Sequence, residues 1–293
     1  MRIITWNVNG LRAVEKKWEI QNLIASYDPD ILLMQEIKGT PDKFSVFLNS
    51  PEPYVAYYNP AEKPGYAGTG AWVHSRVLIT HDVSFVSSFP GDPTANEGRV
   101  AHVELKMKSS VIAKHDQVQV SEKTENGLLH TSQWQTQNTI DIFWIYFPNG
   151  GKSEEAWQGK LVFYREFSAY MDSLRTRGHS VLWGGDINCA HHTIDLARPE
   201  ANDGKIGFHP LERSWMDSCI ADGWHDIWRE QNPNTAEVYS WWDPVTRSRD
   251  RNVGWRIDAL WGDASIMTKT NKIEYFQNQM GSDHCPMMIE LDI

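Results

Sequence analysis

Three strand-like segments of this 293-residue chain end in an acid or an amide, and a fourth segment carries an acid beside an imidazole at the start of a strand. They read TWNVNG at 5–10, LMQE at 33–36, WGGDIN at 183–188 and GSDHCP at 281–286. Carboxylates, amides and an imidazole, without a cysteine cluster, are hard to borderline ligands that suit Mg²⁺ or Mn²⁺. If the fold brings these strand ends to one edge of a sheet, the sequence predicts a divalent-cation site there.

Individual residues within these segments suggest how such a site would work. Asp186 and Asn188 lie two positions apart, so on an extended backbone both side chains point to the same face. Glu36 is a lone acid at the end of an apolar run, which makes it the first candidate metal ligand. A fifth strand-like segment, RIDALW at 256–261, carries Asp258 in its middle.

These segments and several others occur in an order that resembles the exonuclease III family of abasic-site endonucleases, within the wider endonuclease/exonuclease/phosphatase superfamily. The strings that carry the resemblance are WNVNGLRA at 6–13, QEIK at 35–38, EGRV at 97–100, YFPNGG at 146–151, GGDINCAHHTIDLARP at 184–199, NVGWRID at 252–258 and GSDHCP at 281–286. Each string alone is weak, but the ordered set spans nearly the whole chain and is specific.

The resemblance implies a set of functional residues. The catalytic residues it implies are Tyr146, Asp186, Asn188, Asp258 and His284. The metal-side residues it implies are Asn7, Glu36, Asp186, Asn188, Asp283 and His284, with Mg²⁺ or Mn²⁺ as the cofactor. In this scheme Asp186 orients or deprotonates the attacking water, and Asp258 orients a charged His284 that grips the scissile phosphate. Whether Asp186 or His284 is the general base stays open.

The resemblance also implies contacts to duplex DNA. The DNA-binding residues it implies are Asn9, Lys38, Arg99, Asn149, Arg249, Asn252 and Trp255. A small apolar pocket for the bare sugar of an abasic nucleotide would be formed by Trp241, Trp255 and Ile257. A nucleotide without a base swings out of the duplex at low cost, because no stack or pair has to be broken.

The activity implied is that of a Mg²⁺-dependent DNA repair nuclease that cuts 5′ to abasic sites and removes nucleotides from 3′ ends. A different phosphodiesterase of the superfamily, acting on RNA, lipid head groups or inositol phosphates, is the alternative. Such enzymes normally lack the segments NVGWRID and IDLARP, which are present here. A non-catalytic binding module is a third alternative, but it would be expected to have lost some of the acids.

The hydrophobic pattern predicts an α/β protein with one domain over 1–293. We expect strands at 2–6, 31–35, 54–58, 70–73, 100–105, 140–147, 180–185, 256–261 and 286–291. We expect helices at 11–26, at 153–177 with Ser153 as N-cap, and at 209–222 with Pro210 in the first turn. The resemblance implies a four-layer sandwich, with two mixed β-sheets packed face to face and helices on both outer faces.

Composition restricts the partners and the compartment. No apolar stretch approaches the length of a membrane span, and no charged-then-apolar leader precedes the first strand, so we expect neither membrane insertion nor secretion. Three scattered cysteines indicate a reducing compartment, and the cytoplasm is expected. The net charge of −10 argues weakly against nucleic acid, since acids that hold a cation are offset when it binds. Arg247, Arg249, Arg251 and Arg256 concentrate positive charge beside Trp241, Trp242 and Trp255. We expect a monomer.

Two further features are expected to carry no chemistry. Residues from about 106 to 139 form a polar insertion that is atypical of the family, which we expect to be a solvated surface segment. His191 and His192 lie beside the Asp186 segment, but without a cysteine pair or a correctly spaced histidine we expect them to be loop residues rather than zinc ligands.

Overall fold

The computed structural model describes residues 1–109, 111 and 139–293. Two six-stranded mixed sheets dominate this part of the chain. The first sheet has the order β13 (Thr270–Tyr275), β14 (Met287–Leu291), β1 (Arg2–Asn7), β2 (Ile31–Gln35), β4 (Thr69–His74), β3 (Tyr54–Asn59). The second has the order β5 (His81–Ser87), β6 (Val100–Met107), β7 (Thr139–Tyr146), β8 (Ser180–Asp186), β12 (Asp258–Gly262), β9 (His225–Asp226). The expected insertion lies almost entirely outside the described residues.

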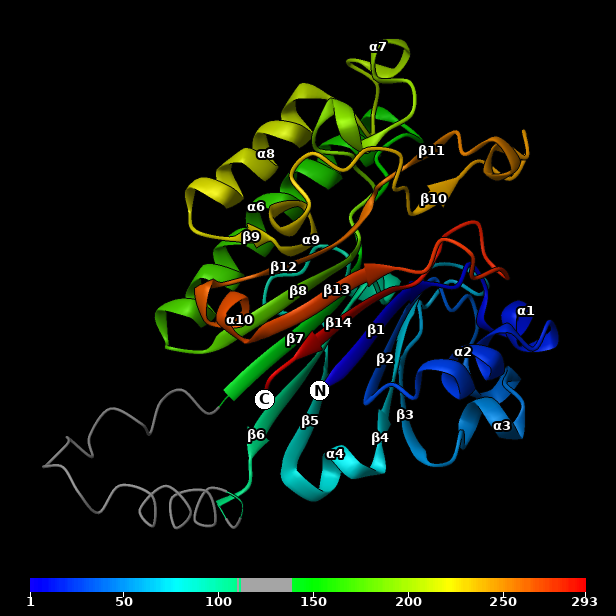
Figure 1. Cartoon of the computed structure of the whole chain (residues 1–293), viewed down its shortest axis with the longest axis vertical. Helices are drawn as coiled ribbons and strands as arrows, with labels where there is room; N and C mark the ends of the chain where they lie inside the picture. The colour runs from blue at the N-terminus through cyan, green and yellow to red at the C-terminus, as the bar shows by residue number, and fades with distance from the viewer. Residues whose placement is uncertain (110, 112–138) are drawn as a thin grey trace, which may run out of the picture.

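Helices cover the outer faces of both sheets, which gives four layers (Figure 1). The α-helices are α1 (Leu11–Lys16), α2 (Glu19–Tyr27), α3 (Val46–Asn49), α4 (Ser75–Thr80), α6 (Glu154–Thr176), α7 (Pro199–Asn202), α8 (Pro210–Ala221), α9 (Ile227–Gln231) and α10 (Ala264–Lys269). Short 3₁₀ turns are η1 (Pro41–Lys43), η2 (Ala95–Glu97), η3 (Thr193–Asp195) and η4 (Ser248–Arg251). The expected four-layer α/β sandwich is confirmed.

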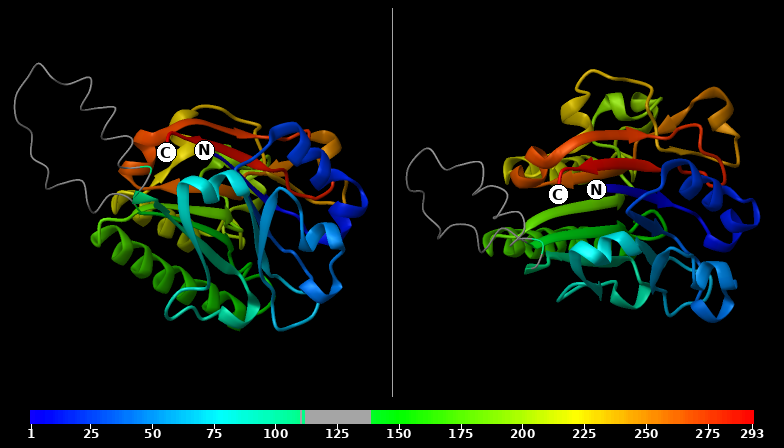
Figure 2. Two further views of the ribbon diagram at one scale, coloured as in Figure 1. Left: turned by 90° about the horizontal axis from the view of Figure 1, so that it is seen from below. Right: turned by 60° about the horizontal axis from the view of Figure 1, so that its bottom comes forward.

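Burial of both sheet faces explains why the central strands read as continuous apolar runs. In β1, Ile3 packs between the two sheets, whereas its neighbour Ile4 packs outward against α1 and α2. In β8, Leu182 faces the inter-sheet core and Trp183 packs outward with Phe163 of α6. This alternation follows from the two-residue period of a strand. Figure 2 shows the layers from two further directions, with the two termini side by side.

The N-terminal helix differs from the expected single helix over 11–26. The chain forms two helices, α1 and α2, with Trp18 between them in a left-handed conformation (φ 62°). Leu11 and Val14 of α1 and Ile20 of α2 are all buried against the sheet. A continuous helix turns about 100° per residue and would carry Ile20 away from that face, so the break realigns the buried side chains.

Helices α6 and α8 agree closely with expectation. The Ser153 hydroxyl accepts a hydrogen bond from the Ala156 amide and caps α6, and Pro210 begins α8. Five strands were not predicted. β5 and β13 are half exposed and weakly patterned, and β9, β10 (Trp241–Trp242) and β11 (Gly254–Trp255) are only two residues long. The cysteines Cys189, Cys219 and Cys285 are buried and free. No helix in the described part of the chain is both long enough and apolar enough to cross a membrane.

Candidate active site

The strand ends that carry the predicted acids and amides meet at one edge of the sandwich. Within the second sheet, Asp186 at the end of β8 pairs in register with Tyr146 of β7 and with Asp258 of β12. In the first sheet, β1 ends at Asn7, and Glu36 directly follows β2, which runs parallel to β1. The close contact between β1 and β8 joins the two groups across the sandwich.

A buried amide links the two carboxylates that are the best candidates for a cation. Asn7 donates from Nδ2 to Glu36 Oε1 at 2.9 Å and to Asp186 Oδ2 at 2.8 Å. Its Oδ1 accepts from the Asn9 amide, so the nitrogen faces the acids. One ligand atom each of Glu36, Asp186 and His284 lies within 4.8 Å of the other two. These oxygens are donors that Mg²⁺ and Mn²⁺ prefer, and the residues therefore fit a divalent ion.

The Lys38 ammonium group already lies beside the Glu36 carboxylate. Its Nζ lies 2.6 Å from Glu36 Oε2, and it also donates to Asn9 Oδ1. A carboxylate pair that recruits a lysine ammonium has the negative potential that a divalent ion needs. Asn9, Glu36 and Lys38 all have positive φ angles, as does Asn188. This conformation is uncommon for residues other than glycine and concentrates at functional sites.

His284 is held between two carboxylates. Its Nδ1 lies 2.8 Å from Asp258 Oδ2, and its Nε2 lies 3.8 Å from Asp186 Oδ2. Burial lowers the pKa of the imidazole, but Asp258 and Asp186 outweigh burial and raise the pKa to about 10. His284 is therefore an imidazolium at neutral pH, with a proton on each ring nitrogen.

Asp186 is also buried, and burial favours the neutral form of its carboxyl group. Burial raises the pKa of this carboxyl to about 7, with Asp258 and Glu36 adding to the effect and His284 and Asn7 opposing it. A bound cation would favour the carboxylate. The position of the side chain is fixed by a 2.9 Å hydrogen bond from the Asn188 amide to Oδ1.

The remaining predicted catalytic residues surround this centre. Asn188 donates from Nδ2 to the Phe147 carbonyl at 2.9 Å and accepts a bond of 3.0 Å from Asn149 Nδ2. Burial raises the pKa of Tyr146 well above its usual range, so the phenol stays protonated. The Arg99 guanidinium lies 4.4 Å from the centre of the Tyr146 ring.

Asp283 lies at the rim rather than at the centre. Its Oδ1 accepts from Asn9 Nδ2 at 2.8 Å, and its Oδ2 accepts from Trp241 Nε1 at 3.1 Å. Burial raises the pKa of Asp283, but His284 and these hydrogen bonds outweigh it, so the pKa is lowered. Asp283 therefore connects the catalytic centre to the ribbon formed by β10 (Trp241–Trp242) and β11 (Gly254–Trp255).

The predicted apolar pocket residues come together beside this ribbon. Trp241 pairs in register with Trp255, and both pack on a small cluster of apolar residues that includes Ile257. The buried members of this cluster are Ala190, Leu196, Phe208 and Ile257. Phe208 is a member that the sequence did not reveal, because it lies in a loop with no apolar periodicity.

The predicted DNA-binding side chains divide into two groups. Lys38 and Asn149 lie beside the catalytic centre. Arg249, in contrast, donates to the carbonyls of Ser282, Gln277 and Gln279 and packs on the Trp242 ring. Its guanidinium therefore supports the 277–282 loop rather than facing solvent.

Two further predicted DNA contacts and one more arginine of the basic stretch are occupied within the protein. Asn252 is held by Trp242 and by the Glu237 carbonyl. Arg99 is 4% exposed and donates to Glu97 and Tyr66. Arg256, the last arginine of the basic stretch, is buried and pairs with Asp195 and Asp226. The arginine-rich segment is thus less basic at the surface than its sequence suggests.

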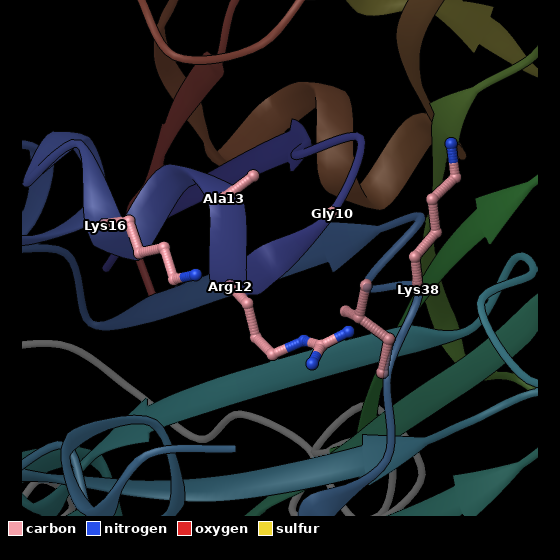
Figure 3. A pocket seen from close by; sticks show the side chains of 6 residues that line it. Gly10, Arg12, Ala13, Lys16 and Lys38 are labelled. Atoms are coloured by element: carbon pink, nitrogen blue, oxygen red, sulfur yellow. The ribbon is translucent and has the colours of Figure 1, made fainter. Parts of the chain in front are cut away.

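The structure places other cations at the edge of the site. A pocket of about 360 Å³ beside the catalytic edge is lined by Gly10, Arg12, Ala13, Lys16, Ile37 and Lys38. Figure 3 shows Arg12 and Lys16 extending from α1 and Lys38 from the segment after β2. Arg12 and Lys16 were not predicted as DNA contacts, although their spacing of four positions on a helix places them on one face.

A second group of metal-type ligands lies elsewhere in the described residues. Glu104, Asp141 and His179 gather at the opposite end of the second sheet. Both oxygens of Asp141 are already occupied, by His102 at 2.7 Å and by His179 at 2.5 Å. His191 Nε2 lies 2.8 Å from Asp217 Oδ1, and in the described part of the chain neither His191 nor His192 belongs to such a ligand group.

Comparisons with known proteins agree with this geometry. The model of the endonuclease/exonuclease/phosphatase family matches residues 4–284. An exodeoxyribonuclease of Bacillus subtilis is 28% identical over 293 residues, covering all of both chains. The DNA repair nuclease APEX1 of Danio rerio is 28% identical and aligns with the whole chain over 83% of its own length.

Solved structures show the same fold. An AP endonuclease from Leishmania major superposes with a TM-score of 0.79 at 23% identity, covering all of this chain and 87% of that one. A 3′-5′ exonuclease from Neisseria meningitidis superposes with a TM-score of 0.76 at 23% identity over the full length of both. The family resemblance seen in the sequence is therefore confirmed, and this chain belongs to the endonuclease/exonuclease/phosphatase family.

Proposed function

We propose that this protein is a divalent-cation-dependent DNA repair nuclease, which cleaves the phosphodiester 5′ to abasic sites and removes nucleotides from 3′ ends of duplex DNA. The observation that carries the proposal is the group of a partly buried Glu36 with the buried Asp186 and His284, at the edge where the strands end. The family membership and the names of the similar proteins support a phosphodiester hydrolase that acts on DNA.

Glu36 and Asp186 would hold the cation, which we propose to be Mg²⁺, with Mn²⁺ as a substitute. When bound, the ion supplies positive charge that stabilises the non-bridging phosphate oxygens. Asn7 aligns the two carboxylates through its amide nitrogen and is not itself placed as a ligand. His284 is also not a ligand in this scheme, because an imidazolium has no free lone pair.

We propose Asp186, rather than His284, as the general base. His284 is protonated on both nitrogens at neutral pH, whereas the Asp186 carboxyl, once ionised, has a free electron pair. Strand β8 ends at Asp186, and Asn188 has a left-handed φ of 55°, so the two side chains do not follow the alternation of a strand. The Asn188 amide bonds Asp186 Oδ1, however, and the two residues together would orient the attacking water. The His284 imidazolium, Asn149 and the Tyr146 hydroxyl would then donate to the phosphate as negative charge develops on it.

The preference for abasic sites would come from the apolar pocket. Trp241, which packs with Trp255 in the cluster that includes Ile257, donates to Asp283, and Asp283 is also bonded to Asn9. A bare sugar placed against these side chains would present its phosphate to the centre. A nucleotide that still carries its base would need more room than a small pocket offers.

The remaining parts of the proposal concern the whole chain. We propose that residues 1–293 form one domain, that the protein acts as a monomer in the cytoplasm, and that duplex DNA is its partner. Its basic contacts would be Lys38, Arg12 and Lys16 around the pocket beside α1.

The test is a labelled duplex with one tetrahydrofuran abasic-site analogue, incubated with Mg²⁺ or with EDTA. We expect a single cut 5′ to the analogue with Mg²⁺, slower shortening of recessed 3′ ends, and no product in EDTA. An intact duplex, a single-stranded RNA and inositol polyphosphates serve as parallel substrates. Faster hydrolysis of RNA or inositol polyphosphates than of abasic DNA would assign the protein to another branch of the superfamily.

The pocket is tested separately with Trp255→Ala. We expect this variant to lose more kcat/KM on the abasic duplex than on recessed 3′ ends, because only the first reaction uses the pocket. Trp224→Ala, a tryptophan that contacts Arg175 and Asp172 near the end of α6 and lies outside the apolar pocket cluster, is the matched control. An equal loss of activity on both substrates would show that Trp255 only supports the fold.

A further inference from the structure

A fully buried ion pair lies directly behind the catalytic loop. Lys160 comes from α6 and Glu212 from the first turn of α8, and neither side chain is exposed. Lys160 Nζ lies 2.6 Å from Glu212 Oε1. Removing two charges from water is costly, and apolar residues of the same volume often stabilise a protein at least as well. A buried pair therefore calls for a reason beyond stability.

The lysine uses its other protons on two residues of the proposed site. Lys160 Nζ donates to the Asn188 carbonyl at 3.0 Å and approaches the Asn149 carbonyl at 3.4 Å. These are the two residues whose side chains bond each other beside Asp186. Lys160 thus fixes the backbone of both from behind, without facing the substrate.

The glutamate holds the loop that borders the apolar pocket. Glu212 Oε2 accepts from the amides of Gly207 at 2.7 Å and His209 at 3.0 Å. Between these two residues lies Phe208, a buried member of the pocket cluster. Gly207 itself lies against the Trp255 ring, where an added Cβ would come within 3.4 Å of the indole.

A direct backbone bond joins the same two loops. Ala190, two residues after Asn188, donates its amide to the Gly207 carbonyl at 2.8 Å. The loop after β8 and the loop before α8 are therefore connected twice, once through backbone and once through the charged pair. The Lys160–Glu212 pair therefore connects Asn188 and Asn149, which are proposed to act on the phosphate, to the loop that carries Phe208.

We propose that Lys160 and Glu212 are positioning residues, which fix the catalytic Asn188–Asn149 unit relative to the pocket formed by Phe208 and Trp255. Their substrate role rests on the proposed function. The pair acts through the residues it holds, and neither side chain touches DNA. A displacement of about 1 Å between the two loops would separate the sugar pocket from the attacking water, and such displacements are costly in rate.

The test is the double variant Lys160→Met with Glu212→Gln. Neither partner is left as an unpaired buried charge, and the glutamine keeps an acceptor for Gly207 and His209, so the protein is expected to fold. We expect kcat on the abasic duplex to fall at least tenfold while KM changes less than twofold. The loss on recessed 3′ ends should be smaller, because that reaction does not need the pocket.

The matched control is Asp141→Asn, which breaks a buried polar cluster at the opposite end of the second sheet. It should lower thermal stability without changing kcat. Wild-type kcat in the folded double variant would overturn the positioning role, as would an equal loss of kcat in Asp141→Asn. Hydrogen exchange provides a second measurement that needs no substrate. The backbone amides of residues 186–190 and 207–209 should exchange faster in the double variant, but not in Asp141→Asn. Unchanged exchange in the double variant would also overturn the proposal. A wild-type protein that fails to cut abasic DNA would instead overturn the proposed function.

Discussion

At the scale of single residues, the site is a row of three carboxylates joined by hydrogen-bond donors, the His284 ring and the Asn7 amide. Asp258, His284, Asp186, Asn7 and Glu36 follow one another through contacts between 2.8 and 3.8 Å. The carboxylates of Asp258 and Asp186 raise the pKa of His284, because charges interact strongly where water is excluded. Substitutions that keep shape but remove one charge are therefore the most informative.

Glu36→Gln should raise the Mg²⁺ concentration needed for half-maximal activity. The amide keeps the size of the side chain but removes the charge that attracts the cation. Rates measured across a Mg²⁺ titration, from micromolar to tens of millimolar, check this. Glu62→Gln, an exposed acid, is the control. A titration curve that coincides with that of the wild type would show that Glu36 is structural.

Asp258→Asn should lower the pKa of His284 in the metal-free protein from about 10, because Asp258 is the strongest influence that opposes burial. Since the folded pKa lies above the ordinary value, the stabilisation is complete below about pH 6.5 and is lost as the pH rises through about 10. NMR titration of the His284 ring measures the shift directly. A pKa unchanged in the variant would contradict the assigned pairing.

At the scale of elements, buried polar anchors and close strand approaches hold the site-bearing segments. Arg256, which leads from β11 into β12, bonds Asp195 of η3 and Asp226 of β9. Arg229 of α9 also bonds Asp195. This network fixes the ribbon that carries Trp255 to the second sheet, which explains why a residue in an apparently basic patch is buried.

Asp195→Asn should destabilise the protein by about 3–5 kcal/mol at neutral pH, because it leaves two buried arginines without their shared partner. Burial raises the pKa of Asp195, but Arg256 and Arg229 outweigh it and hold the pKa well below 3.8. The stabilisation is thus present above about pH 4 and is lost progressively as the pH falls from there towards the lowered pKa of the folded protein. Urea unfolding at pH 7 and pH 3 should show a smaller difference from wild type in acid. If the variant and the wild type differ by the same free energy of unfolding at both pH values, this ionic contribution is excluded. Asp82→Asn, which changes an exposed acid, is the control.

Gly185→Ala should cost about 3 kcal/mol or more. Its φ of 118° is strained for an alanine, and the added Cβ would lie 2.5 Å from the Ile145 carbonyl and 2.7 Å from Gln35 of the other sheet. Gly159→Ala, inside α6 with nothing within 4 Å, should instead be neutral or stabilising by about 0.5–1 kcal/mol. Thermal unfolding of the two variants checks both signs. Equal melting temperatures would contradict the close approach of the two sheets.

At the scale of the whole molecule, a net charge of −10 coexists with a locally basic edge. Some of the acidic side chains lie in the proposed catalytic centre or pair with buried arginines, so they add little negative charge to the surface. Arg12, Lys16 and Lys38 remain around the pocket beside α1 (Figure 3). Binding to a polyanion depends on this local distribution more than on the total charge.

Duplex DNA binding should therefore weaken as salt rises. The double variant Arg12→Ala with Lys16→Ala should reduce the slope of log K against log salt by about 0.9 for each phosphate that the variant no longer neutralises. Fluorescence anisotropy over a salt series measures the slope. Lys272→Ala, where the lysine pairs with Glu274 on β13, should leave it unchanged. An affinity that does not vary with salt would be incompatible with a DNA substrate.

The sequence by itself determined the family, the sandwich fold and the edge at which the chemistry is placed. Central strands buried on both faces produce apolar runs that are visible in one dimension, and an acid such as Asp186 at the end of such a run must lie at a sheet edge. Ser153 and Pro210 likewise marked helix starts, because capping depends on neighbours a few residues away.

Only the tertiary structure decided what each polar side chain does. Arg249 and Arg256 look alike in sequence. In the structure Arg249 donates hydrogen bonds to carbonyls of the 277–282 loop, whereas Arg256 pairs with buried aspartates. Lys160 and Glu212 lie in different helices, and nothing local indicates that they meet behind Asn188. The physical reason is that backbone periodicity is set by near neighbours. The partner of a charge is set by whichever distant segments the packed core brings within about 3 Å.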